Sequence, residues 1–496
     1  MRQNKYISFI YSQITKNNFA RNIVLLSSAS VLAQLINITS MPLLSRLYSP
    51  EDFGVLSLFS SVLGLLSTIS GFRYYLVLPL ARRERYVHSI VWLSVLLQFS
   101  FMLIIIFTVF IGGRYLADTR YAVLYPYRYL VPGGVFAISI YGMSVQWVIR
   151  EKSFSLIAKT KLTQTLIAFL VKIAGAYAGL RPLGLLLGFV AGQSCGGIKL
   201  IRHIIQLKGK PRINFTHIKR SAISYRNMFL IDTPGALLNT AGAYMLPIII
   251  AYYYADDIVG SFSMAQNLLI LPGVIIGQSI GQVFSQKAGE ARYNGTLASV
   301  TGKVFELLAR TGLYPVLLCS LFAPDIFDIT LGSQWREAGY FASIIAPWVS
   351  INFIYSPMSI LFTTLMIQRT ALVFTSVYTV TRIGSVAFFG GESPLCAMTA
   401  LSISGTVMML IGVTLLMYKA GVDKIATRMY RIAFELLIEL LPCIAFLFYG
   451  KNNLYVGFFS ILTSLLVYIY INLKFYKNIR NNKVAITNKT RHRSSR

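Results

Sequence analysis

Two positively charged residues lie near the middle of apolar segments that are long enough to span a bilayer. Lys172 is in the segment 162–180 and Arg382 is in the segment 371–390, 210 residues further on. A cation at the centre of a bilayer costs about 3 kcal/mol on insertion scales, so it normally faces a partner or a water-filled cavity. The sequence Lys-Ile-Ala-Gly begins at the first cation and Arg-Ile-Gly-Ser at the second. The pattern indicates a duplicated membrane protein whose interior attracts anions.

A third cation, Arg73, lies six residues before Pro79, near the cytoplasmic end of the second predicted helix. The planar guanidinium group of arginine suits phosphate oxygens, so Arg73 is a candidate to meet a phosphate-bearing cargo on entry. Its side chain could instead extend to the membrane surface. We expect Lys172 and Arg382 to bind cargo by charge-assisted hydrogen bonds, with Arg73 as a further contact.

Three more charged side chains lie in predicted helices. Glu306 and Arg310 are four residues apart, a spacing that favours an ion pair within one helix, with Arg310 lining the transport pathway as the alternative. Asp232 precedes Pro234 and a glycine near the start of the seventh predicted helix. A helix break frees backbone carbonyls, so Asp232 could bind a coupling H⁺ or Na⁺ there. It could equally pair with Lys172 or cap the broken turn.

Composition places the chain in the class of polytopic helical membrane proteins. Of its 496 residues 55% are hydrophobic and 13% are charged, and the mean hydropathy is +0.62. The apolar runs are continuous rather than alternating, which excludes a β-barrel. The net charge of +29 is dispersed between apolar segments, which argues against nucleic-acid binding. The four Cys and four His residues form no metal-ligand pattern, so we expect no metal site.

The apolar periodicity predicts about fourteen transmembrane helices. They cover residues 22–45, 53–78, 87–111, 125–149, 162–180, 183–203, 227–251, 259–284, 304–323, 339–366, 371–390, 395–418, 434–450 and 454–475. An even number places both termini on one side. The loops on that side contain 33 Lys and Arg residues, against seven on the other. By the positive-inside rule, both termini are predicted to be cytoplasmic.

The two halves of the chain resemble each other at an offset of about 206 residues. Met41-Pro42 and the segment 48–54 recur as Leu246-Pro247 and the segment 254–260, and Glu84 maps onto Glu290. Six helices per copy restore the starting side, so the repeats are parallel, related by an axis along the membrane normal. The predicted parts are a leader at 1–21, an N-lobe at 22–203, a basic cytoplasmic linker at 204–226, a C-lobe at 227–418, two appended helices at 434–475 and a basic tail at 476–496.

The linker has a mixed apolar and basic pattern that suits a helix lying on anionic lipid headgroups. The two appended helices have no repeat partner and no central cation. Truncation after about Met429 is therefore expected to leave an inserted and partly active protein.

Two segments resemble the Wzx-type oligosaccharide flippases. The first is Ser-Arg-Leu-Tyr-Ser-Pro-Glu-Asp-Phe-Gly at 45–54, followed by Phe-Arg-Tyr-Tyr at 72–75 before Leu78-Pro79. The second is Leu-Gly-Ser-Gln-Trp-Arg-Glu-Ala-Gly at 331–339, and the resemblance extends from about residue 20 to 420. This family shares a superfamily with multidrug and toxin extrusion transporters and peptidoglycan precursor flippases. One departure is Tyr75, where the family often has glutamate, so no role of that carboxylate carries over.

The resemblance implies two six-helix lobes around a central cleft and alternating access. The implied activity is translocation of undecaprenyl-diphosphate-linked oligosaccharide, such as an O-antigen repeat unit, across a bacterial inner membrane. Membrane lipids, a polysaccharide polymerase and a chain-length regulator are the other candidate partners. We expect no cofactor, with H⁺ or Na⁺ as candidate coupling ions.

Two other functions remain as alternatives. An ion-coupled exporter of cationic drugs would require carboxylates along its pathway, whereas the mid-helix charges here are mostly positive. An O-antigen polymerase or ligase is the enzyme alternative, and such proteins generally resemble one another in a large external loop with arginine and histidine. The predicted outer connections here are short and contain no histidine. The sequence therefore favours a transporter over an enzyme.

Overall fold

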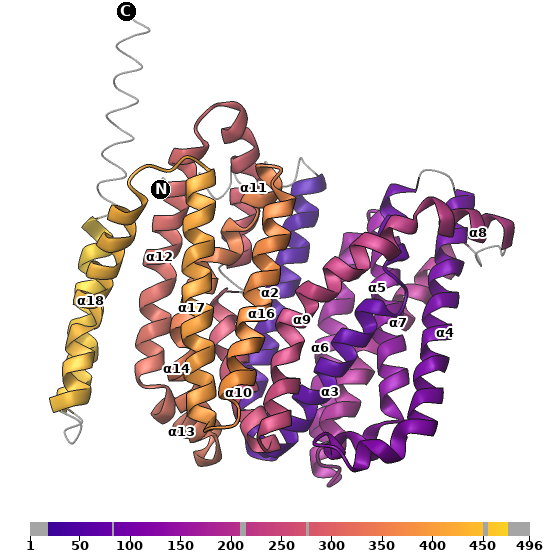
Figure 1. Ribbon diagram of the computed structural model, residues 1–496, viewed down its shortest axis with the longest axis horizontal. Helices are drawn as coiled ribbons and strands as arrows, with labels where there is room; N and C mark the ends of the chain where they lie inside the picture. The colour runs from indigo at the N-terminus through magenta and orange to yellow at the C-terminus, as the bar shows by residue number, and fades with distance from the viewer. Residues whose placement is uncertain (1–17, 82–83, 209–214, 274–276, 450–454, 475–496) are drawn as a thin grey trace, which may run out of the picture. The chain divides into compact units, whose positions relative to one another are not determined.

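The computed structural model describes residues 18–81, 84–208, 215–273, 277–449 and 455–474, and all secondary structure within these ranges is helical (Figure 1). The first helices are α2 (Asn18–Leu47), α3 (Pro50–Ile69), α4 (Glu84–Ala117), α5 (Leu130–Arg150), α6 (Phe154–Tyr177), α7 (Leu183–Lys208) and α8 (Phe215–Ser224). The next are α9 (Thr233–Tyr253), α10 (Asp256–Pro272), α11 (Gln278–Tyr293), α12 (Leu297–Leu321), α13 (Ala323–Leu331) and α14 (Arg336–Met358). The last are α15 (Leu361–Thr364), α16 (Gln368–Phe389), α17 (Pro394–Lys419), α18 (Ile425–Tyr449) and a helix at Tyr455–Lys474.

Short 3-10 and π segments interrupt this pattern. They are η1 (Tyr74–Leu80), η2 (Ala122–Tyr127) and η5 (Ser333–Trp335), which are 3-10 helices, and η3 (Met228–Asp232), which is a π-helix.

Eleven helices in the described ranges are long and apolar enough to cross a membrane. Each corresponds to one of the predicted spans, so the helical membrane fold is confirmed. The other three predicted spans are also helical, and they correspond to α2, to α10 with α11, and to α18. The helix predicted at 259–284 differs, because α10 ends at Pro272 and α11 begins at Gln278. The total of fourteen crossings stays a prediction.

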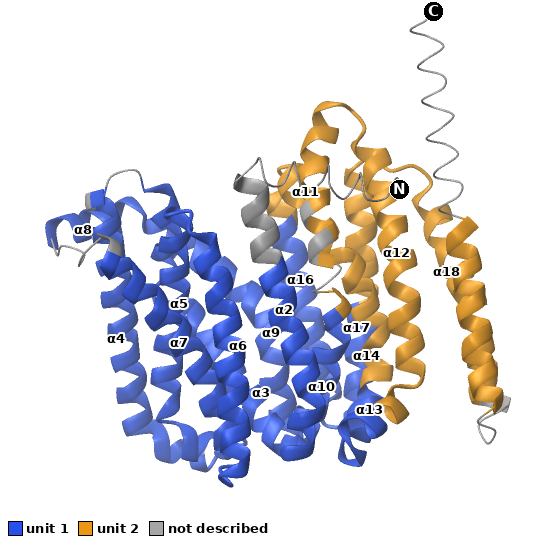
Figure 2. Ribbon diagram, turned by 180° about the vertical axis from the view of Figure 1, so that it is seen from behind, with its two compact units in different colours: residues 1–271, 327–341, 371–405 blue, residues 272–326, 342–370, 406–496 orange. Residues whose placement is uncertain are grey.

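The chain divides into two compact units (Figure 2). Unit 1 contains residues 1–271, 327–341 and 371–405, and unit 2 contains 272–326, 342–370 and 406–496. In unit 1, α6 packs along α7 and α2, and α3 packs along α9 and α5. In unit 2, α12 packs against α18 and α11. The division into an N-lobe, linker and C-lobe stays a prediction.

Close packing of α6 on α7 depends on a row of glycines in α7. A Cβ atom at Gly184 would lie 2.8 Å from the Cα atom of Gly175, and one at Gly188 would lie 2.5 Å from Lys172 Cγ. Gly192 and Gly196 continue this row against Ala168 and Gln164 of α6. Small residues let two membrane helices approach closely, so this packing fixes the position of α6 and of Lys172.

The second predicted helix ends earlier than its apolar pattern indicates. Ser49 caps the start of α3 by accepting a hydrogen bond from Asp52 N, and Pro50 occupies its first turn. The helix ends at Ile69 because Phe72 and Arg73 adopt left-handed backbone conformations, with φ of 43° and 57°. Left-handed residues cannot continue a right-handed helix. The chain continues as η1, and Arg73 lies at the bend.

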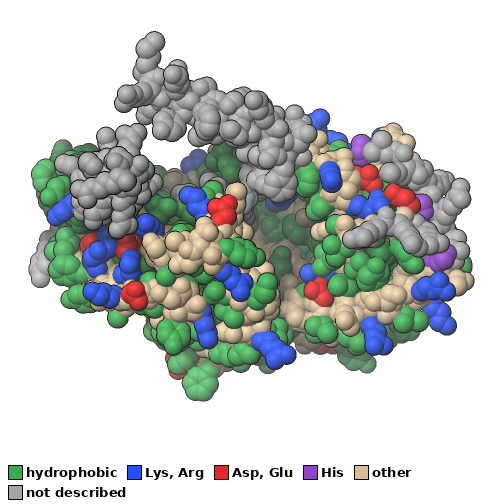
Figure 3. All heavy atoms as spheres, turned by 90° about the horizontal axis from the view of Figure 1, so that it is seen from above, with side chains coloured by type: hydrophobic (Ala, Val, Ile, Leu, Met, Phe, Trp, Pro, Cys, Tyr) green, Lys and Arg blue, Asp and Glu red, His purple; other side chains and the backbone are tan. Residues whose placement is uncertain are grey.

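The predicted linker contains the short helix α8, which packs on α4. The Tyr74 hydroxyl donates a hydrogen bond of 3.3 Å to the carbonyl oxygen of Ala222 in α8. Ile218 is buried, whereas Phe215, Lys219 and Arg220 are exposed. Figure 3 views the α8 end of the molecule and shows Lys and Arg side chains spread over that face.

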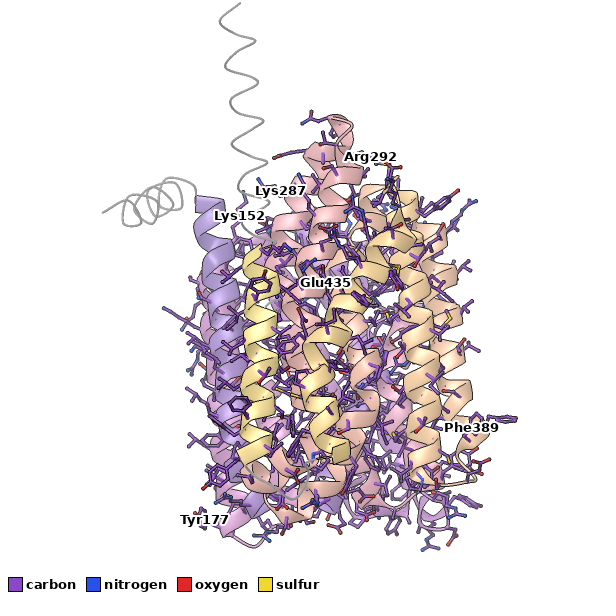
Figure 4. The ribbon with its side chains drawn as sticks, turned by 90° about the vertical axis from the view of Figure 1, so that its left-hand side faces the viewer. Lys152, Tyr177, Lys287, Arg292, Phe389 and Glu435 are labelled. Carbon is purple, nitrogen blue, oxygen red and sulfur yellow. The ribbon has the colours of Figure 1, made fainter. Side chains whose placement is uncertain are left out.

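Figure 4 shows the direction of the helices in unit 1. Lys152, just before α6, lies at one end of this unit, and Tyr177, the last residue of α6, lies at the other. Phe389, at the end of α16, lies at the same end as Tyr177. This agrees with the predicted threading, in which the loop before α6 is on one side and the loops after α6 and α16 are on the other.

Candidate functional site

Lys172 lies in α6, where its side chain packs over the glycine row of α7. Its carbonyl oxygen accepts a hydrogen bond of 2.6 Å from the hydroxyl of Tyr48. The residue is partly buried, and within the ranges that the structure describes its ammonium group makes no hydrogen bond or ion pair. Lys172 is therefore held in place through its backbone carbonyl, and in the described ranges no carboxylate pairs with its ammonium group.

Arg382 lies in α16 and is 4% exposed. Its Nη1 atom donates a hydrogen bond of 3.1 Å to the carbonyl oxygen of Gly242 in α9. The guanidinium carbon lies 4.9 Å from the centre of the Tyr378 ring, one turn earlier in the same helix. A carbonyl dipole and an aromatic face both stabilise a buried cation without cancelling its charge. Sequence reasoning missed Tyr378, although its spacing of four residues from Arg382 was a usable signal.

Arg73 and Asp232 form an ion pair, with Arg73 Nε 2.6 Å from Asp232 Oδ2. Asp232 is the last residue of the π-helix η3, and α9 begins immediately after it. Phe72 and Phe229 pack edge to face beside this pair, with ring centres 4.7 Å apart. The structure thus joins the bend after α3 to the irregular turn before α9. The partner of Asp232 is therefore Arg73, and not Lys172, which the sequence suggested as one candidate.

Arg310 belongs to unit 2, where its surroundings are different. Its Nη2 atom lies 2.5 Å from Glu435 Oε2 of α18. Glu306 of α12 contacts two arginines of α18. Its Oε1 atom lies 2.5 Å from Arg428 Nη1 and 3.2 Å from Arg431 Nη2. These ion pairs connect α12 to α18, and the pair within α12 that the spacing of Glu306 and Arg310 predicts stays a prediction. Glu435 lies part-way along α18 in Figure 4.

The two sequence segments that carry the family resemblance contact each other in unit 1. The carbonyl oxygen of Ser45 accepts hydrogen bonds from Trp335 Nε1 at 2.9 Å and Gln334 Nε2 at 2.6 Å. The Ser45 hydroxyl donates to the carbonyl oxygen of Leu331 at 3.0 Å. Trp335 is fully buried and packs edge to face on Phe53, with ring centres 5.2 Å apart. These motif residues therefore hold separate parts of the chain together.

The predicted site residues thus fall into three groups. Arg73 and Asp232 are in direct contact, and Arg382 is bonded to α9, the helix that follows Asp232. Lys172 lies on α6 of the same unit, and Arg310 lies in unit 2. No cluster of His, Cys, Asp and Glu that could hold a metal is present in the described part of the chain. In unit 1, Lys172 and Arg382 each offer a positive charge that suits non-covalent interaction with an anion.

Solved structures with the same fold are membrane transporters. The chain is similar to the lipid II flippase MurJ in an inward closed conformation, with a TM-score of 0.69, 15% identity, and coverage of 92% of this chain and 99% of that one. It is also similar to an inward-facing multidrug resistance MATE family transporter of the MOP superfamily, with a TM-score of 0.61, 14% identity, and coverage of 81% and 98%. At such identities the likeness establishes the fold.

A family model described as polysaccharide biosynthesis protein matches residues 43–340. No curated protein matches the sequence. The family match covers more than half of the chain and includes both motif segments at 45–54 and 331–339. The chain therefore belongs to the family of polysaccharide biosynthesis proteins, and it has the fold of MurJ and of the MATE transporters.

Proposed function

We propose that this protein is a flippase for undecaprenyl-diphosphate-linked oligosaccharide. It carries the cargo from the cytoplasmic to the periplasmic leaflet of a bacterial inner membrane by alternating access, and it makes or breaks no covalent bond. The family match supports a role in polysaccharide biosynthesis, and the fold supports transport. An O-antigen repeat unit is the cargo class that we favour.

The observation that supports this proposal most strongly concerns the groups that surround Lys172 and Arg382, the two cations in the middle of predicted membrane spans. Lys172 has no carboxylate partner in the described ranges, and Arg382 is held by a carbonyl group and a tyrosine ring. An uncompensated buried charge costs several kcal/mol, so leucine at position 172 would serve the membrane fold better. We infer that the charge of Lys172 is kept because it binds the diphosphate of the cargo, and that Arg382 provides a second positive charge for the same anion.

Arg73 has a different part in this mechanism. Its guanidinium group is already paired with Asp232, so an arriving phosphate has to compete with that carboxylate. Arginine can bind phosphate and carboxylate oxygens alike in a bidentate manner, and the diphosphate carries more negative charge than a single carboxylate, which favours the exchange. Release of Asp232 would then free a carboxylate at the moment of cargo entry, and a coupling H⁺ or Na⁺ would bind there. We propose Asp232 as this coupling-ion residue.

The second candidate function is ion-coupled export of cationic drugs, which the likeness to a multidrug resistance transporter supports. A cationic drug requires a carboxylate that is available in the transport pathway. Asp232 is neutralised by Arg73, and Glu306 and Glu435 are paired with arginines. The charge arrangement therefore favours an anionic cargo.

The test is a deletion strain complemented with wild-type or variant protein. We expect the deletion to abolish surface polysaccharide and to accumulate lipid-linked repeat units on the inner leaflet. Both defects should be reversed by wild-type protein and not by the Lys172→Glu/Arg382→Glu variant at equal membrane level. Normal polysaccharide in the deletion strain, or loss of dye extrusion as its only defect, would refute the flippase function.

A further inference from the structure

Helices α3 and α10 cross within their first turns at a distance that leaves no room for a side chain. A Cβ atom at Gly54 of α3 would lie 1.9 Å from the carbonyl oxygen of Asp256. A Cβ atom at Gly260 of α10 would lie 1.8 Å from the carbonyl oxygen of Pro50. Real Cβ contacts are never this short, so the crossing requires glycine at both positions. The two backbones are in direct contact there.

The crossing is reciprocal at the offset of the internal repeat. Adding 206 to 50 and 54 gives 256 and 260, so Gly54 meets the equivalent of Pro50, and Gly260 meets Pro50 itself. Such an exchange of contacts is the property of an interface on a two-fold axis. One turn further, the hydroxyl oxygens of Ser57 and Ser263 lie 2.5 Å apart, and these positions also differ by 206. A residue that touches its own equivalent lies on the axis itself.

The interactions across this crossing are of a kind that can separate and form again. They consist of van der Waals contact between two backbones and one hydrogen bond between neutral hydroxyl groups. No ion pair between α3 and α10 is seen in the described ranges. Tightly packed small residues, with weak Cα–H···O contacts, need no rearrangement of long side chains when helices part.

A second contact between the repeats lies beside the start of α3. Phe53 packs on Trp335, and Ser45 at the end of α2 accepts two hydrogen bonds from the segment 334–335. Residues 45–54 belong to the first repeat and residues 331–339 to the second. In the predicted threading, all of these residues face the periplasm. The end of unit 1 that cargo would leave through is therefore closed.

We propose that the α3–α10 crossing at Gly54, Ser57, Gly260 and Ser263 is the periplasmic gate of the protein, closed in this structure. The proposal rests on the flippase function above and adds the place at which the repeats must separate. Because the crossing lies on the pseudo-two-fold axis, both repeats move away from it equally when the gate opens. Release of cargo then requires loss of the Ser57–Ser263 hydrogen bond.

The test is a reversible disulfide across the gate. In a chain with Cys195, Cys319, Cys396 and Cys443 replaced by serine, Ser57→Cys and Ser263→Cys are introduced together. The matched control is Ser70→Cys with Ser139→Cys, whose hydroxyl oxygens are also 2.5 Å apart but which join the residue after α3 to α5 within the first repeat. Disulfide formation is measured by loss of thiol labelling, independently of transport.

We expect both pairs to form disulfides on oxidation. Polysaccharide export should fall tenfold or more for the Ser57→Cys/Ser263→Cys protein and should return on reduction, which also shows that the variant is folded. The control pair should keep its activity in both states. Full export by the oxidised gate pair would make the crossing a fixed pivot and overturn the proposal.

Failure of the gate pair to form a disulfide while the control pair forms one would also overturn it, since the crossing would then not have this geometry. If the protein is not a flippase, the experiment gives a different result. In that case the disulfides would form as expected, but the deletion strain would export polysaccharide normally without the protein.

Discussion

Units 1 and 2 hold their buried charges in opposite ways. In unit 1, Arg382 contacts a carbonyl oxygen and a tyrosine ring, and Lys172 contacts glycines. In unit 2, Arg310 and Glu306 pair with charged residues of α18. A buried ion pair satisfies itself and fixes two helices together, whereas a cation held by neutral groups can still bind an anion. The difference separates the proposed cargo-binding residues of unit 1 from residues of unit 2 that join two helices.

The largest effect should come from reversing the charges in unit 1. Lys172→Glu or Arg382→Glu should abolish polysaccharide export, because a carboxylate would repel the diphosphate. Replacement by alanine should lower export about tenfold or more, since a lost charged hydrogen bond is worth about 1.5–3 kcal/mol and about 1.4 kcal/mol is a factor of ten. The measurement is surface polysaccharide, normalised to membrane protein by blot.

Lys172→Arg and Arg382→Lys are the matched controls and should retain much of the activity. If a well-expressed Lys172→Ala/Arg382→Ala protein made full polysaccharide, the cations of unit 1 would not bind cargo, and the proposed difference between the two units would be wrong.

The next largest effect should follow from removing α18. Truncation after Met429 would leave Arg310 without Glu435. Breaking a buried ion pair on one side costs about 3–5 kcal/mol, so the truncated protein should be lost from the membrane. This replaces the expectation from the sequence that truncation leaves a partly active protein. Glu435→Gln is the smaller test of the same pair and should lower the thermal unfolding midpoint in detergent.

For unit 2, the control is Arg310→Met combined with Glu435→Leu, which removes both charges together. It should restore much of the stability that Glu435→Gln loses, because neither member of the pair is left without the other. An active protein truncated at Met429 would show that this ion pair does not support the fold.

An intermediate effect is expected at the α3–α10 crossing. Gly54→Ala places a methyl group where the Asp256 carbonyl oxygen lies, so the helices have to move apart. We expect export to fall severalfold while Gly133→Ala in α5, which has open space around it, keeps wild-type activity. The comparison is made by surface polysaccharide at equal protein level. Equal activity of the two variants would argue against close packing at the crossing.

The smallest effect should be seen at Arg73 and Asp232. Their side chains are 26% and 41% exposed, so solvent screens the pair and its worth is about 1 kcal/mol or less. Asp232→Asn should lower export a few fold, and the exchange Arg73→Asp/Asp232→Arg should not recover the loss, because it moves both the proposed cargo contact and the proposed ion site. Recovery by the exchange would show that the pair acts only as a contact between two bends.

The sequence predicted the helical class, the position of most spans and the repeat offset, because these depend on local apolar runs and on direct comparison of residues. It did not predict the ion-pair partners. Arg73 meets Asp232 because the backbone turns left-handed at 72–73, and no residue type there signals this conformation. Glu306 and Arg310 also pair with residues of α18 that are more than a hundred positions away, and their spacing within α12 gives no sign of this. Long-range packing determines such partners.

The reciprocal crossing also bears on how such a chain could arise. A protein of only one repeat, carrying the proline, glycine and serine of α3 at the same spacing, would already possess a self-complementary face. Two copies of it would associate as a symmetric homodimer without any further substitution. Duplication and fusion of its gene would then preserve an existing interface, and neither half could afterwards replace its glycine, because the new Cβ atom would meet a backbone carbonyl of the other half.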